Sequence, residues 1–249
     1  MDSGYYVAYA GLAARMQALD VVASNLANAS TPGFKSQSSF YRALSAAQDG
    51  EFLSPLNQAV NKFGILGGSR VDARSGSLES TGNDMDLAME GDAFFSVQTA
   101  AGIRYTRNGS FQLNAARQLT TQDGNFVLAE QGPARTVPIT LPSGTVSVSP
   151  DGTISVDGGL VAKLHVVQFA PGTEITPEGN SMYAAPAGSE RPANNSNVRQ
   201  GMLESSNLNP VQGAVGLILL QRQAEMLGRA LTIFSTDFDR AAAQDVPRV

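Results

Sequence analysis

Apolar residues spaced three and four apart at the two ends of the chain restrict its fold more than any other feature. The N-terminal set is Tyr5, Tyr9, Leu12, Met16, Leu19, Ala23 and Leu26. The C-terminal set is Leu217, Leu220, Ala224, Leu227, Leu231, Phe234 and Phe238. Spacing of this kind is typical of helices that pair along a narrow seam. The pattern predicts two long terminal helices, over about 4–28 and 210–243, that form a coiled-coil-like layer.

Residues that end and begin helices support these limits. Pro32 and Gly33 stand where the first helix should stop. Ahead of the second helix, the capping candidates and a proline suited to a first turn are Ser206, Asn207, Asn209 and Pro210. An ordinary pair of core helices in one compact domain is the alternative. The narrow stripes, and the glycines at 213, 216 and 228, favour close helix pairing instead.

The middle of the chain has a different period. From about residue 85, apolar and polar residues alternate, and Leu160 to Phe169 reads as one longer strand. The dipeptides Asn108-Gly109, Asp123-Gly124 and Asp151-Gly152 mark hairpin turns. These signals predict an antiparallel β domain.

The fold class predicted from these patterns is α+β. Residues 1–35 and 205–249 form the terminal helical domain, and residues 81–204 form the central β domain. Residues 36–80, which are rich in Ser and Gly, are predicted as an extended connector.

Composition argues against several classes of function. The formal net charge is -5, so DNA and RNA are not expected partners. With no Cys and one His, the chain has no means of thiolate chemistry or of building a zinc finger or iron–sulfur site. No apolar run approaches the ~20 residues of a membrane span, and the N-terminus lacks a basic region. We expect neither membrane insertion nor a cleaved signal peptide.

An acidic cluster and the single histidine are the candidates for chemistry. Asp84 and Asp86 match the first positions of a calcium loop, but Ala88 occupies the next ligand position. With Glu90 and Asp92 nearby, a carboxylate pair for glycoside hydrolysis is an alternative, although a solvated strand entry is the commoner role. His165 has no acidic partner near it in sequence. We predict no catalytic residue, cofactor or metal site, and therefore no enzyme.

Three stretches carry a family resemblance. The first contains Asn25, Leu26, Ala27, Asn28, Thr31, Gly33, Phe34 and Lys35. The second runs over 81–95 and continues at 105–109, and the third runs over 201–211 with Gln221 and Arg222 downstream. In order and spacing they closely resemble the signatures of the bacterial flagellar rod and hook family. Length and the short connector favour a rod subunit, most like the proximal-rod protein, with the distal-rod protein as nearest competitor.

The resemblance implies a structural subunit that polymerises helically into the hollow drive shaft of the basal body. It would transmit torque from motor to hook and conduct exported subunits, with the terminal helices in an inner tube. Implied partners are other copies, other rod proteins, hook–basal-body neighbours and the flagellar type III export apparatus. The implied location is the periplasm-spanning rod. Ser24, Gly213, Gly216 and Ala224 depart from the family pattern. The alternative is another extracellular tube, stalk or adhesin subunit.

Overall fold

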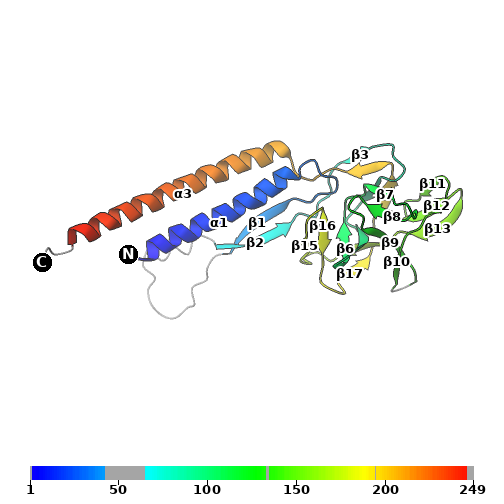
Figure 1. Cartoon of the computed structure of the whole chain (residues 1–249), viewed down its shortest axis with the longest axis horizontal. Helices are drawn as coiled ribbons and strands as arrows, with labels where there is room; N and C mark the ends of the chain where they lie inside the picture. The colour runs from blue at the N-terminus through cyan, green and yellow to red at the C-terminus, as the bar shows by residue number, and fades with distance from the viewer. Residues whose placement is uncertain (1, 43–64, 133–134, 194, 246–249) are drawn as a thin grey trace. The chain divides into compact units, whose positions relative to one another are not determined.

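The computed structural model describes residues 2–42, 65–132, 135–193 and 195–245, which form an α+β chain that is mostly β (Figure 1). These residues fall into two units. The first unit draws on 1–26, 37–69 and 209–249, and the second on 27–36 and 70–208. The domain limits predicted from the sequence stay a prediction.

The first unit contains both helices of the described residues and a two-stranded sheet. Helix α1 is Asp2–Ala27 and helix α3 is Pro210–Asp245. Strand β1 (Gln37–Arg42) pairs with β2 (Ile65–Val71). As far as they are described, α1 and α3 lack an apolar stretch with the length and hydropathy that a membrane crossing requires.

The predicted coiled-coil-like helical layer is wrong. The described residues contain only two helices, and most of their regular elements are strands. In addition, the predicted N-terminal seam is not the buried face of α1. Tyr9 and Met16 on that seam are 60% and 52% exposed, whereas the smaller Ala14 and Ala18 are buried. The physical reason is that α1 is apolar on more than one face. A spacing of three and four can then be drawn through several stripes, and packing selects another one.

The second unit is built from antiparallel strand pairs. Its largest sheet has ten strands, and a three-stranded sheet and two strand pairs complete the unit. The ten are β5 (Phe94–Thr99), β6 (Gly102–Thr106), β7 (Phe111–Leu113), β8 (Leu119–Thr121), β9 (Phe126–Glu130), β10 (Thr136–Pro138), β14 (Val166–Phe169), β15 (Thr176–Pro177), β16 (Met182–Ala184) and β17 (Glu190–Pro192). The three are β11 (Val146–Val148), β12 (Thr153–Val156) and β13 (Gly159–Lys163).

The two remaining strand pairs bring the C-terminal end of the unit back to its beginning. Strand β18 (Asn197–Gln200) pairs with β4 (Leu87–Glu90), and β19 (Met202–Glu204) pairs with β3 (Leu78–Ser80). Residues 107 to 126 positions apart therefore lie side by side. The last two strands of the unit therefore pair with its first two strands.

Two apolar clusters form the core of this unit. The larger gathers fully buried side chains from most of the sheets, including Met89, Phe95 and Val127. In the smaller, Phe94 packs edge-on against Tyr183, with ring centroids 5.9 Å apart. Burial of these apolar surfaces supplies the main stabilisation of the fold.

Two of the three predicted hairpin turns are confirmed. Asp123-Gly124 joins the paired strands β8 and β9, and Asp151-Gly152 joins β11 and β12. Asn108-Gly109 was predicted to do the same and does not, because β6 pairs with β5 and β16 while β7 pairs with β8. The carbonyl of Gly109 instead accepts a hydrogen bond from the amide of Leu87, at 3.0 Å. This non-local contact overrides the local turn preference.

The long strand predicted over 160–169 is two strands. The chain leaves β13 at Lys163, and after Leu164 and His165 it enters the ten-stranded sheet as β14. The amide of Leu164 donates to Gly152, and that of His165 donates to Leu128. The segment is divided because β13 pairs with β12, whereas β14 pairs with β5 and β17.

Candidate functional site

Three charged side chains from distant parts of the sequence meet in the interior of the second unit. Lys35 Nζ lies 2.5 Å from Glu204 Oε1, and Arg107 Nη1 lies 3.2 Å from Glu204 Oε2. All three side chains have an exposed fraction of 0%. Each one comes from a different stretch of the family resemblance. We call Lys35, Arg107 and Glu204 the buried cluster.

Backbone groups supply further hydrogen bonds to the buried cluster, although the buried Nε of Arg107 has no hydrogen-bond partner. Lys35 Nζ donates to the carbonyl of Arg74 at 2.8 Å, and Arg107 Nη2 donates to that of Gly91 at 2.7 Å. Glu204 Oε1 accepts a further bond from the amide of Gly76, at 2.8 Å. The guanidinium of Arg107 also stacks 4.9 Å from the centroid of the Phe94 ring, in cation–π geometry.

The electrostatics of the cluster depend on its one carboxylate. Burial lowers the pKa of Lys35 and of Arg107, because it penalises the charged form of each. Glu204 opposes this effect: its charge and its hydrogen bonds raise both pKa values, but burial is the larger cause and both stay lowered. Two buried cations therefore share one buried anion.

The turn before Lys35 fits closely against Arg107. Gly33 has a φ of 66°, and a Cβ placed there would overlap the carbonyl group of Arg107 and the amide nitrogen of Asn108. The amide of Gly33 donates to the carbonyl of Glu204 at 2.6 Å. Phe34 is buried, and the amide of Lys35 donates to the hydroxyl of Tyr183 at 3.0 Å. The motif docks into the β unit through both backbone and side chain.

The asparagines of the signatures bind backbone groups. In the first unit, Asn25 Nδ2 donates to the carbonyl of Gln37 at 2.7 Å, and its Oδ1 accepts from the Gln37 amide at 2.9 Å. In the second, Asn207 Oδ1 accepts from the amide of Ser36 and its Nδ2 donates to the carbonyl of Asp72, both at 2.8 Å. These side chains bind backbone in the way that a neighbouring strand would.

Other predicted site residues form turns and caps. The amide of Thr31 donates to the carbonyl of Asn28 at 3.0 Å. Ser206 Oγ accepts from the amide of Leu208 at 3.3 Å. Asn209 Oδ1 accepts from the amides at 211 and 212 and so caps the N-terminus of α3. Their roles in assembly stay predictions.

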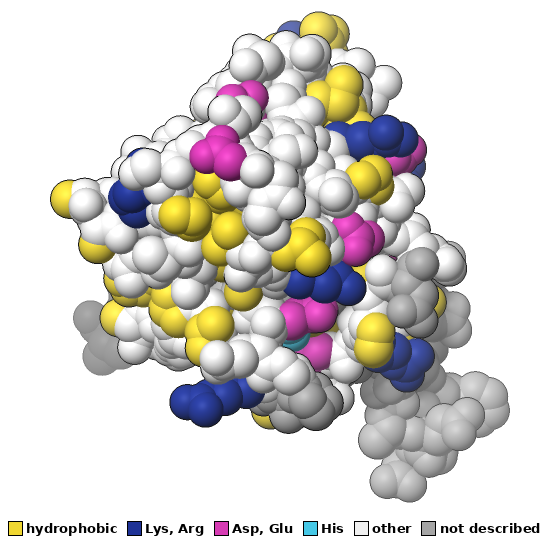
Figure 2. Space-filling view, turned by 90° about the vertical axis from the view of Figure 1, so that its right-hand side faces the viewer, with side chains coloured by type: hydrophobic (Ala, Val, Ile, Leu, Met, Phe, Trp, Pro, Cys, Tyr) yellow, Lys and Arg dark blue, Asp and Glu magenta, His cyan; other side chains and the backbone are white. Residues whose placement is uncertain are grey.

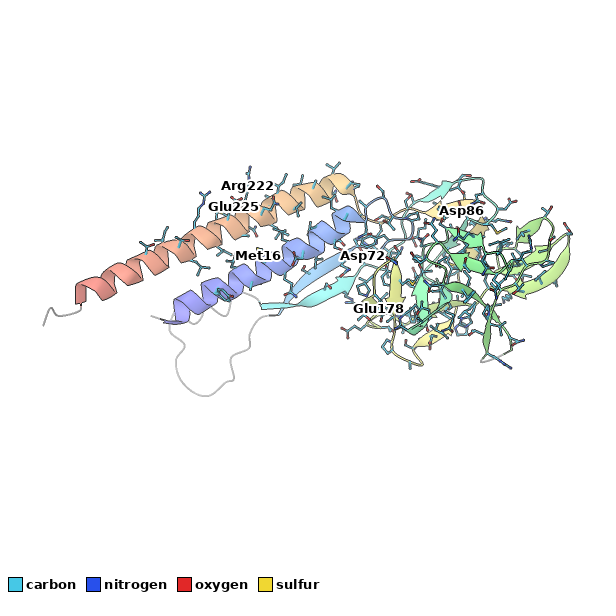
Figure 3. All side chains as sticks on the ribbon, viewed as in Figure 1. Met16, Asp72, Asp86, Glu178, Arg222 and Glu225 are labelled. Carbon is cyan, nitrogen blue, oxygen red and sulfur yellow. The ribbon has the colours of Figure 1, made fainter. Side chains whose placement is uncertain are left out.

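The predicted assembly residues of the helices are only partly buried. On α1, Leu12, Leu19, Ala23 and Leu26 are half-buried, and Ala27 is exposed. On α3, the half-buried set is Leu217, Leu220, Ala224, Leu227 and Leu231. Gln221 and Arg222 are exposed, and Arg222 projects from α3 near Glu225 (Figure 3). The side chains of Tyr5, Phe234 and Phe238 lie outside the described residues.

A second apolar face of α3 was missed by the seam analysis. Its members are Val211 (72% exposed), Val215 (52%), Ile218 (49%), Leu219 (54%), Met226 (62%) and Ile233 (61%). At about 100° per residue, these six positions fall within an arc of about 100°, opposite the half-buried set. We call them the exposed stripe. Their positions in the sequence were the available signal, but the half-buried set on the opposite face has the more regular spacing of three and four.

The acidic cluster is divided among structural contacts. Asp86 (labelled in Figure 3) is buried and accepts hydrogen bonds from Thr81 Oγ1 at 2.7 Å and Asn83 Nδ2 at 3.1 Å. Glu90 pairs with Arg199 across strands β4 and β18, at 2.8 Å. In the described ranges, no group of three or more potential ligands is arranged to hold a metal ion. Asp86 therefore shapes the turn that precedes β4.

His165 contacts strands β5 and β9 of the ten-stranded sheet. Its Nδ1 is 2.8 Å from Ser96 Oγ, and Ser96 is fully buried. Burial lowers the pKa of His165, while the charges of Glu130 and Glu190 raise it more weakly. Figure 2 shows the histidine, in cyan, beside acidic side chains on this face of the molecule.

Stability is expected to decrease as the pH is lowered from neutral through 6.5, the ordinary pKa of a histidine side chain. The lowered pKa means that the unfolded chain, with an ordinary value of 6.5, binds the proton before the folded chain does. The contribution of His165 is therefore fully present above 6.5 and is lost as the pH falls. Urea denaturation at several pH values measures it. His165→Gln should flatten the dependence, and an equal slope in both proteins would contradict the assignment.

These features define a class of protein. The β unit is closed around a buried cluster, and a long helix presents a row of apolar side chains to its surroundings. Buried charges held by several bonds favour one rigid arrangement, and exposed apolar rows are typical of protein–protein contact surfaces. The class is a structural protein that assembles with others.

Comparisons with known proteins give the family. A model described as flagella basal body rod protein matches residues 6–35, and one described as the D1 domain of the flagellar hook proteins FlgE, FlgF and FlgG matches residues 88–156. The flagellar basal-body rod protein FlgF of Caulobacter vibrioides is 32% identical over 252 residues, covering 100% of both chains. FlgF of Salmonella typhimurium is 33% identical over 97% of each chain. FlgG of Bacillus subtilis is 27% identical over 86% of this chain and 88% of its own.

The chain belongs to the flagellar basal-body rod protein family. It is a structural rod subunit and not an enzyme, and the resemblance seen in the three sequence stretches is confirmed. Among the motif residues, Arg107 and Glu204 were not singled out beforehand. The signal was present: each is a charged residue at the end of a short run of strand residues.

Proposed function

We propose that the chain assembles with other rod subunits through the exposed stripe of α3, as part of a hollow helical shaft of the basal body. The proposal includes transmission of torque to the hook, passage of exported subunits, and a position like that of the FlgF relatives. Its support is the exposed stripe itself, read together with the family.

The exposed stripe has the chemistry of a contact surface between helices. Six large apolar side chains along one face lose contact with water when a partner covers them, a transfer that is favourable by about 25 cal/mol per Å² before the entropy cost of association is subtracted. Arg222 and Arg229 are exposed on the same side and add charge that selects a partner. Since the half-buried set occupies the opposite side, α3 can pack within its own unit and against a neighbour at once.

A contact between this face and a different surface of a neighbour can repeat from one subunit to the next. Such heterologous contacts generate rings or open helical filaments, and a shaft requires the open form. The rod function therefore needs at least two different surfaces on each subunit. The exposed stripe is the first of them.

Leu219→Asp is expected to block assembly and swimming while the subunit still folds. The side chain is 54% exposed, so a charge there costs the monomer little, but it would be buried against the neighbour at a cost of several kcal/mol. Swimming in soft agar and recovery of the subunit in purified basal bodies measure the effect. Circular dichroism of the purified variant checks its folding.

Leu160→Asp is the matched control. Leu160 is also an exposed leucine, at 80%, but it lies on β13 of the second unit. The Leu160→Asp variant should swim at nearly the wild-type level. Full motility of Leu219→Asp, or equal loss in both variants, would refute the assignment of the stripe.

A further inference from the structure

We propose that the buried cluster controls the order of folding: the segment around Lys35 cannot dock into the second unit until the last strand, β19, has paired and placed Glu204 in the interior. We call this arrangement a folding latch. This inference goes beyond the assembly function and concerns how the subunit reaches its folded state. It rests on the order of the three residues in the chain and on their burial.

The cluster joins residues that are far apart in sequence. Lys35 and Glu204 are 169 positions apart, and Arg107 and Glu204 are 97 apart. Strand β19 is the last strand before α3, so the only anion of the cluster arrives after nearly every other part of the unit. The two cations precede it in the chain.

Without Glu204, the fold would bury two like charges together. Lys35 and Arg107 would keep the backbone carbonyls of Arg74 and Gly91 as acceptors, but no carboxylate of the cluster. Both side chains are fully buried, and an uncompensated charge in such a place is strongly destabilising. An intermediate that lacks β19 must therefore keep the segment around Lys35 away from the sheet.

Strand β19 brings the carboxylate and backbone contacts in one step. The carbonyl of Glu204 accepts from the amide of Gly33, and the amide of Ser205 donates to the carbonyl of Ser77 at 2.8 Å. The carboxylate then binds both cations and the amide of Gly76. Docking of the Lys35 segment and pairing of β19 become one event. When the chain is presented from its N-terminus, the unit stays open until residue 204 is available.

Pulse-labelling hydrogen exchange during refolding of the full chain tests the latch. The amide of Lys35 is the informative probe, because its acceptor, the Tyr183 hydroxyl, precedes β19 in the chain. In the wild type, this amide should become protected in the same phase as the amide of Ser205. Protection of Lys35 in an earlier phase would overturn the proposal.

Two variants sharpen the test. Lys35→Met removes the charge that the docking segment would bury, so its docking no longer needs the carboxylate of Glu204 and the amide of residue 35 should become protected ahead of Ser205. An unchanged order in Lys35→Met would show that charge does not set the timing and would overturn the latch.

Glu204→Gln keeps the size of the side chain and removes its charge. Native-state exchange of the Lys35 amide should become faster on the order of 100-fold. The matched control is Glu90→Gln, which removes an exposed carboxylate from the Glu90–Arg199 pair and should change that exchange by less than about threefold. Equal effects of the two substitutions would overturn the proposal.

Discussion

Gly33→Ala is expected to destabilise the second unit by roughly 3–5 kcal/mol. Two causes add. A φ of 66° is unfavourable for alanine, and the new Cβ would overlap backbone atoms of Arg107 and Asn108, which cannot move aside as a flexible side chain can. The turn would have to leave its site and carry Lys35 with it. Urea denaturation followed by circular dichroism measures the loss.

Gly82→Ala separates the two causes. Gly82 has a φ of 70°, and a Cβ there would meet no atom of the described residues within 4 Å. Only the backbone strain applies, so the expected loss is about 1–2 kcal/mol. Losses of equal size at the two glycines would mean that the close approach to Arg107 has no energetic weight.

Glu204→Gln is expected to cost about 3–5 kcal/mol, and Lys35→Met clearly less. Glu204 is the shared anion, so its neutralisation leaves two buried cations with no carboxylate partner in the cluster. Removal of Lys35 instead leaves Arg107 and Glu204 as a neutral pair. The charge count of the cluster therefore predicts the larger loss for Glu204→Gln.

The comparison is made by urea denaturation of both variants at neutral pH. Lys35→Met/Glu204→Gln should be no more stable than Lys35→Met alone, because Arg107 then loses its only carboxylate in the cluster. A greater loss for Lys35→Met than for Glu204→Gln would contradict this account of the cluster.

Local features of this protein follow from its sequence because short-range chemistry determines them. Asp123-Gly124 and Asp151-Gly152 form the predicted turns, since Gly adopts positive φ at little cost and the strands pair across a few residues. Asn209 and Pro210 begin α3 for a similar reason, through a side chain that caps the next amides. The family, too, was readable from three short stretches of sequence, and relatives that match the whole chain confirm it.

Tertiary structure alone decided which surfaces pack. Both terminal helices carry apolar residues on more than one face, so spacing could not identify the buried stripe, and the predicted coiled-coil-like layer was wrong. Asn108-Gly109 has the same local preference as the other turns, but the carbonyl of Gly109 accepts a hydrogen bond from the amide of Leu87, and the flanking strands pair with other strands. The buried cluster joins residues up to 169 positions apart, and such meetings depend on the closure of the whole chain, which no local pattern encodes.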